Sequence, residues 1–206
     1  MSQVASPYGF RIMKYVGETP FSAGMHSYSL TTNNPTAMFF GDPVGLVNGS
    51  IVGLTATPTT ALSANSPIGV FMGCSYIDPV RGFVNSQYLP ANAATNGATK
   101  ILIKIYDYPW VVMAIQADGS VPVSKIGFNA SLNVGAGSVF TGDSTWSLNS
   151  ASLSPGTAAT LAVQVYDFVN TPEPSPGAGS QPGDPFTDVL VIWNFGVHRF
   201  LNSGGQ

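Results

Sequence analysis

Short apolar runs rich in β-branched and aromatic residues recur along the chain, and glycine, proline, asparagine and aspartate separate them. Runs of this length bounded by turn residues are typical of β-strands. Thr157 to Thr171, which lacks glycine and proline, alternates with a period of two around Leu161 to Tyr166 and predicts another strand. The other predicted strands are Met38–Phe40, Val44–Val47, Ile68–Met72, Ile101–Tyr106, Trp110–Gln116 and Val189–Phe195.

Two Asx-Gly dipeptides lie between such runs and predict tight hairpin turns, because both residues readily adopt a positive φ. Asn48-Gly49 would join Val44–Val47 to Ile51–Leu54. Asp118-Gly119 would join Val111–Gln116 to Val121–Ile126.

Many short strands without a convincing helix predict an all-β fold, either a small tulip-like β-barrel or a jelly-roll-like sandwich. We expect residues 1–20 to form an extended arm and residues 202–206 a polar tail. Residues 21–201 would form the β-rich domain, in which two packed β-subdomains would divide near residue 120. Thr171 to Pro185 is rich in proline, glycine and serine and predicts a long exposed loop.

The chain is poor in charge. Only 8% of its 206 residues are Asp, Glu, Lys or Arg, against roughly a quarter in an ordinary soluble domain. A surface with so little charge tends to associate, so we expect other subunits to cover much of it. The few basic residues are scattered, which argues against nucleic-acid binding. No apolar stretch approaches the roughly 20 residues of a membrane-spanning helix, and the N-terminal segment does not resemble a signal peptide.

Motifs for catalysis are missing from the sequence. His26 and His198 are far apart along the chain, and the single cysteine, Cys74, excludes an internal disulfide and has no metal-ligand spacing around it. The chain contains no Gly-x-Ser-x-Gly elbow, phosphate-binding loop or zinc motif. We therefore expect no enzyme activity, no cofactor and no metal.

One catalytic alternative stays open. Asp107 and Asp167 lie among aromatic residues, where burial would raise a carboxyl pKa, and two such acids facing one cleft could hydrolyse a glycan. An aspartate after a strand more often caps a turn. The aromatic residues that could stack on a sugar are Tyr106, Tyr108, Trp110 and Phe168, but aromatic residues at strand positions usually fill a core or an interface.

A pattern of glycines, turns and strands runs through six segments: Phe40–Val47, Pro67–Tyr76, Tyr88–Ala91, Asp107–Val121, Ile126–Gly142 and Asp188–His198. These segments resemble the head decoration, or cement, proteins of tailed bacteriophages. The similarity lies in glycines, turns and strand patterns between about residue 35 and residue 200, and it does not extend to the loop at Thr171–Pro185. Gly41 and Gly69 fall where such a fold needs close backbone approach or tight curvature.

The resemblance implies a structural virion protein, made in the host cytoplasm, that binds the outer surface of a capsid and stabilises the shell. Its partners would be the major capsid protein and further copies of itself, as a homotrimer rather than a dimer. Arg11 and Lys14 in the N-terminal arm are the candidate shell contacts. The alternatives are another virion component, such as a head fibre or tail protein, and a carbohydrate-binding module or glycan-degrading enzyme.

Overall fold

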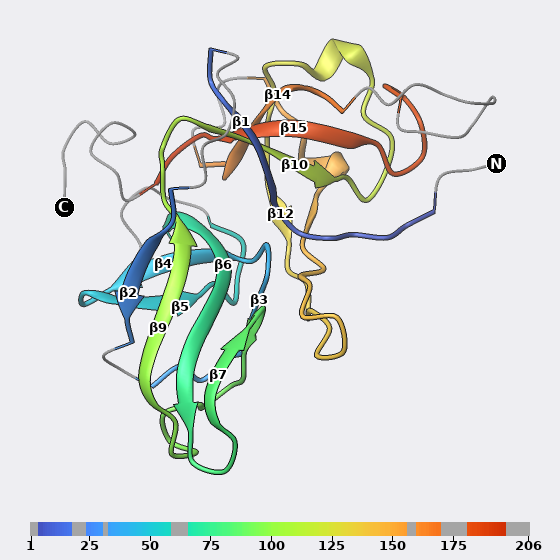
Figure 1. Ribbon diagram of the computed structural model, residues 1–206. Helices are drawn as coiled ribbons and strands as arrows, with labels where there is room; N and C mark the ends of the chain where they lie inside the picture. Colours follow the sequence, from blue (N-terminus) through green and yellow to red (C-terminus); the bar gives the residue numbers. More distant parts are fainter. Residues whose placement is uncertain are drawn as a thin grey trace.

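The computed structural model describes residues 4–17, 24–30, 33–58, 66–155, 160–169 and 181–196. Within them the fold is all-β, as the sequence predicts, with two main antiparallel sheets and two short 3₁₀ turns, Val123–Lys125 and Ser150–Ser152. The strands of the two sheets cross at a wide angle (Figure 1).

The first sheet has five strands in the order β1-β10-β15-β14-β11. Its strands are β1 (Arg11–Tyr15), β10 (Val111–Gln116), β15 (Asp188–Trp193), β14 (Val163–Phe168) and β11 (Asn129–Ala130).

The second sheet has six strands in the order β2-β9-β6-β4-β5, with β7 also paired to β6. Its strands are β2 (His26–Ser29), β9 (Thr99–Tyr106), β6 (Pro67–Asp78), β4 (Pro43–Val47), β5 (Ser50–Gly53) and β7 (Gly82–Ser86). Two small ribbons pair β3 (Met38–Phe39) with β8 (Tyr88–Leu89), and β12 (Leu132–Asn133) with β13 (Ser147–Leu148).

The larger core fills the space on one face of the five-stranded sheet and extends into the second sheet. Phe10, Trp146 and Trp193 pack there, and Val70 of β6 and Tyr106 of β9 belong to the same cluster. The smaller core lies within the six-stranded half. Because the larger core takes residues from both sheets, the two halves share part of their burial rather than folding as separate units.

Two glycines stand where backbone segments approach closely, Gly69 between β6 and β9 within the six-stranded sheet and Gly41 beside the chain that enters β1. A Cβ on Gly69 would lie 2.3 Å from the carbonyl oxygen of Tyr106. Gly41 has a φ of 93°, and a Cβ there would lie 2.9 Å from the carbonyl oxygen of Phe10. Both distances are shorter than a real Cβ contact, so the close approach predicted for these glycines is confirmed.

Most of the predicted strands are confirmed, and one predicted hairpin is wrong. The Asn48-Gly49 turn joins β4 to β5, with both residues at positive φ. The Asp118-Gly119 hairpin does not form, because Val123–Lys125 form a 3₁₀ turn where the second strand was expected, and β10 pairs with β1 and β15 instead. Both edges of β10 are thus occupied by strands distant in sequence, and Pro122 cannot donate a ladder hydrogen bond.

Two of the predicted domain boundaries, the division near residue 120 and the N-terminal arm, can be compared with the structure. The chain passes from the six-stranded to the five-stranded sheet between Tyr106 and Val111, at the β9–β10 connection, rather than near residue 120. Over residues 4–17 the expected arm belongs to the folded domain, since β1 pairs with β10 and Phe10 is fully buried. Residues 171–180 of the predicted loop and the tail at 202–206 lie outside the described residues.

We expect Phe10→Ala to lower the free energy of unfolding by about 3 to 5 kcal/mol, since it removes a buried ring that packs 5.0 Å from the Trp193 ring. Urea denaturation measures the change. Val4→Ala is the control, because Val4 is 73% exposed in the same segment and its loss should change stability by less than about 0.5 kcal/mol. Equal, small effects of the two variants would mean that the segment is a detachable arm after all.

Candidate functional site

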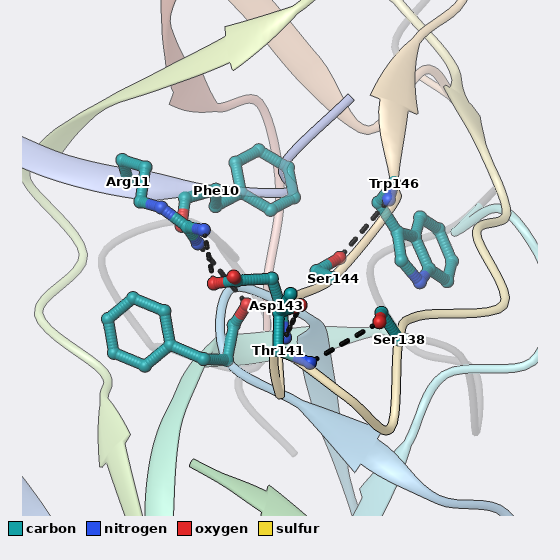
Figure 2. A network of polar contacts seen from close by, with 8 residues as sticks. Phe10, Arg11, Ser138, Thr141, Asp143, Ser144 and Trp146 are labelled. Carbon is teal, nitrogen blue, oxygen red and sulfur yellow. Dashed lines mark hydrogen bonds and ion pairs between the residues drawn. The ribbon is translucent and has the colours of Figure 1, made fainter. Parts of the chain in front are cut away.

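An arginine–aspartate clamp holds a projecting loop against the first strand of the chain (Figure 2). The Arg11 guanidinium donates to the Asp143 carboxylate at 2.8 Å and to the Phe40 carbonyl at 3.2 Å. The same group lies 4.8 Å from the centre of the Phe40 ring and 5.6 Å from that of Tyr8. Arg11 is therefore engaged within its own chain, and its side chain stays 28% exposed.

The loop at 138–143 is held in one conformation by backbone hydrogen bonds. Ser138 N donates to the Asp143 carbonyl at 2.9 Å, and Gly142 N donates to the Ser138 carbonyl at 2.7 Å. Two further bonds tie the loop to Phe40, which donates to the Gly142 carbonyl and accepts from Ser144 N, both at 2.9 Å. The loop is thus a rigid projection.

Its tip is apolar. Phe140 is 97% exposed, and the neighbouring Val139 is also exposed. We call these two residues the knob. A phenylalanine that is held in water by a rigid loop gains nothing from folding, so its apolar surface is available to a partner.

A second apolar tip lies at the end of the six-stranded sheet, on the turn from β6 to β7 (Figure 1). Val80 is 91% exposed and Phe83 is 76% exposed. Asp78 fixes the turn by accepting from Val80 N at 2.9 Å and Arg81 N at 2.8 Å. We call Val80 and Phe83 the hairpin tip.

Lys14, the other predicted contact, lies away from the clamp. Its ammonium is 5.7 Å from the centre of the Tyr166 ring on β14. Arg11 and Lys14 share β1, and each contacts a group within the fold.

Asp42 is a buried carboxyl where the two sheets meet. Its Oδ2 accepts from Phe39 N at 2.8 Å, and Ser144 hydrogen-bonds to the carboxyl as well. Burial raises the pKa of Asp42 to about 6, and these hydrogen bonds offset the shift only in part. Its side chain helps to line a pocket of about 260 Å³ together with Phe39, Leu54 and Trp146.

The two candidate catalytic acids have separate surroundings. Asp107 accepts from the Tyr28 hydroxyl at 2.7 Å and lies 2.7 Å from Nδ1 of His26, so it fastens the edge strand β2. Burial, together with this carboxylate, raises the pKa of Tyr28 to about 12. Asp167 accepts from the backbone N–H of Phe168 at 2.9 Å on β14, in the other sheet. No described contact joins the two acids.

The other candidates are distributed between the core and the surface. Tyr106, Phe168 and Cys74 are buried, Tyr108 and Trp110 are about half exposed, and His198 lies outside the described residues. Across the described ranges, no three His, Cys, Asp or Glu side chains gather as a metal site. Nor does any described helix have the length and apolar character to cross a membrane.

Comparison of the chain with protein-family models, with curated proteins and with solved structures finds no match.

Sequence reasoning missed the apolar tips that the structure exposes. The signal for the hairpin tip lies in Asp78-Pro79-Val80-Arg81-Gly82, where turn residues flank an apolar one. Phe140 stands alone in a stretch of glycine, serine and threonine, from Gly135 to Ser144. An isolated aromatic residue in such a stretch has no strand neighbours to pack against, and this could have marked it as exposed.

We expect Arg11→Met and Asp143→Asn to couple by about 1 to 2 kcal/mol in a double-mutant cycle of unfolding, because each variant breaks the same charged hydrogen bond. High salt should reduce the coupling, since the pair is partly exposed. Asp78→Asn is the control partner, because Asp78 caps a distant turn and should show no coupling with Arg11→Met. Additive effects of Arg11→Met and Asp143→Asn would contradict the clamp.

The buried Asp42 predicts an unusual pH dependence of stability. Its pKa is raised in the folded protein, so the folded state binds the proton more tightly than the unfolded state does. The contribution of Asp42 to the free energy of unfolding is therefore fully present below about pH 4 and is lost as the pH rises through 6. The loss amounts to about 3 kcal/mol for a shift of this size. Asp42→Asn should remove this decline when urea unfolding is measured between pH 4 and pH 7.

Asp118→Asn is the matched control, because the pKa of Asp118 is shifted in the opposite direction from that of Asp42. Burial opposes the shift, but hydrogen bonds from Ser150 and Asn133 outweigh it and lower the pKa of Asp118. The stabilisation from Asp118 is therefore present above its ordinary pKa and is lost as the pH falls. An Asp42→Asn protein with the wild-type pH profile would show that Asp42 titrates normally.

Proposed function

We propose that this chain is a structural protein that binds the outer surface of a bacteriophage capsid and stabilises the shell by bridging its subunits. The observation that carries the proposal is the rigid β-scaffold with few charges, which ends in exposed apolar tips. The resemblance of several segments to phage head decoration proteins supports it independently.

The physical basis is burial between subunits. Each tip offers apolar area whose removal from water is favourable, at about 25 cal/mol per Å². Many copies on one shell add their contacts, so modest affinity per site still stabilises the particle. Because only 8% of the residues of the chain are charged, covering its surface carries little desolvation penalty.

The hairpin tip is the proposed shell contact. It lies at the end of the six-stranded sheet that is farther from the five-stranded sheet (Figure 1). Val80 and Phe83 form an apolar surface beside the exposed Arg81, a combination that is enriched in the centre of protein interfaces. Arg11 and Lys14 stay candidate shell contacts, since both are only partly buried.

The test uses capsids of the phage that encodes the chain. Stripping the protein should lower the temperature at which particles break, and adding it back should restore that temperature in proportion to site occupancy. Cosedimentation measures the occupancy, and release of the genome on heating measures breakage. If stripped and restored particles break at the same temperature, the shell role is wrong.

We expect the double variant Val80→Ser, Phe83→Ser to lose most of its occupancy on stripped capsids while it folds normally. Val123→Ser is the control, since Val123 is also exposed but lies on the 3₁₀ turn beside the other sheet. Full occupancy by the double variant would place the shell contact elsewhere.

A second candidate function is glycan binding, as in a carbohydrate-binding module. It is favoured by Tyr108 and Trp110, which are both about half exposed on the connection between β9 and β10. Binding to a glycan array that is lost in Trp110→Ala, without any effect of the protein on capsid stability, would favour it over the shell role.

A further inference from the structure

The solvent side of the six-stranded sheet is a surface that the described chain leaves open, where β9, β6 and β7 lie side by side (Figure 1). Opposite residues on paired antiparallel strands point to the same side of a sheet. Phe83 of β7 therefore lies beside Ile77 of β6. Ser75 of β6 lies between Asn85 of β7 and Leu102 of β9. We call this surface the outer face, and its residues are Ser75, Ile77, Phe83, Asn85, Leu102 and Lys104.

A hollow of about 220 Å³ opens on the outer face, where the pairing of β6 with β9 is irregular. The register shifts between Phe71 and Gly73, and Gly73, with a φ of 123°, has no side chain to fill the space opposite Lys104. Such bulges are common next to binding and active sites. The hollow is lined by Gly73, by Met25 and Met72, and by the polar side chains of Asn85, Ser86, Gln87 and Lys104.

The polar side of the hollow offers hydrogen-bond donors. Lys104 Nζ donates to Asn85 Oδ1 at 3.4 Å, which leaves ammonium protons for a further partner. No ion pair involves Lys104 in the part of the chain that the structure describes. Ser86 Oγ accepts from Tyr88 N at 3.2 Å, so the hydroxyl proton of Ser86 stays available to donate. An ammonium and a hydroxyl group beside methionines favour a carboxylate on an apolar stem.

The outer face carries an excess of positive charge in an acidic protein. Residues 66–106 contain three basic residues, Arg81, Lys100 and Lys104, and one acidic residue, Asp78. Arg81 and Lys100 are exposed and lie at the end of the sheet that carries the hairpin tip. The Asp78 carboxylate already accepts from two backbone N–H groups of that turn. Because the whole chain has a net charge of −3, this face differs from the rest of the protein and attracts an acidic surface.

We propose that the outer face docks an acidic segment of a partner protein. A carboxylate of the segment binds Lys104 at the hollow, and apolar side chains of the segment pack on Leu102, Ile77 and Phe83. The chemistry of this contact follows from the outer face alone, whereas the identity of the partner as the shell rests on the proposed function.

The apolar share of the outer face favours a protein over a nucleic acid or an anionic membrane. Phe83 is 76% exposed, Leu102 is 41% exposed and Ile77 is 36% exposed. A phosphate backbone is neutralised by a larger set of cations than this face carries. Apolar side chains at the centre of a contact and charged side chains around it are typical of a protein–protein interface.

Titration with a synthetic peptide, followed by amide NMR, tests the contact on the isolated protein. The peptide has leucines flanking glutamates, and its counterpart with glutamines is the control ligand. The glutamate peptide should shift the amide signals of β6, β7 and β9 around Lys104, and raising the salt from about 0.05 M to about 0.5 M should weaken its binding. Equal shifts with the two peptides, or shifts away from the outer face, would overturn the proposal.

Lys104→Gln should weaken binding of the glutamate peptide by at least about threefold, because it removes the charge at the hollow and keeps a long side chain. Lys125→Gln is the matched control, since Lys125 is also partly buried but lies on the 3₁₀ turn beside the other sheet. Leu102→Thr tests the apolar part in the same way, with Phe140→Thr in the knob as its control. Equal affinities of each variant and its control would refute the contact.

Other occupants of the outer face would give different results. Binding of a single-stranded oligonucleotide or of anionic lipid vesicles there, without binding of the glutamate peptide, would assign the face to phosphate groups. Shifts at the outer face that grow with the concentration of the protein alone would assign it to a second copy. Either result would show the proposal to be wrong.

Stripped capsids separate this contact from the shell role. Lys104→Glu should lower the occupancy on capsids more than Lys125→Glu does, since it reverses the charge at the hollow. A wild type that stabilises capsids, together with equal occupancy of the two variants, would count against the outer face and leave the shell role standing. A wild type that binds the glutamate peptide at the outer face but does not stabilise capsids would count against the shell role alone.

Discussion

Three residues, Phe40 to Asp42, form the backbone crossing on which the rest of the structure depends. Gly41 donates to the Phe71 carbonyl and accepts from Phe10 N, both at 2.9 Å, and the Asp42 carbonyl accepts from Phe71 N at 2.8 Å. Phe40 exchanges two bonds with the loop that ends at Ser144. One short segment therefore connects β6, the chain that enters β1 and the projecting loop, and any side chain on Gly41 would separate them.

The crossing explains why the surface can be so poor in charge and still hold rigid projections. Burial of Phe10, Trp146 and Trp193 stabilises the fold through the hydrophobic effect. Arg11, one of the few basic residues of the chain, forms an ion pair with Asp143 of the same chain. Of the few charges, those on Arg11, Asp42 and Asp107 serve internal contacts. What remains outside is largely neutral, with apolar tips, and such a surface suits coverage by other molecules.

Local patterns predicted the strands well and their partners poorly. The alternation around Leu161–Tyr166 and the apolar run at Val189–Phe195 both correspond to strands, β14 and β15. The Asp118-Gly119 turn signal was misleading because β10 gains more from two long partners than from a short hairpin with residues 121–126. The partner of Arg11 within the chain, Asp143, is 132 positions away, so no local pattern could indicate this ion pair.

The sequence by itself determined the all-β character and the turn at Asn48-Gly49. These features depend on φ preferences and on a period of two, which neighbouring residues impose on one another. Only the tertiary structure decided that β1 belongs to the sheet, that Asp42 is buried, and that Phe140 and Phe83 are exposed while Phe10 is not. Burial of an aromatic residue depends on which distant segments cover it, and no local pattern carries that information.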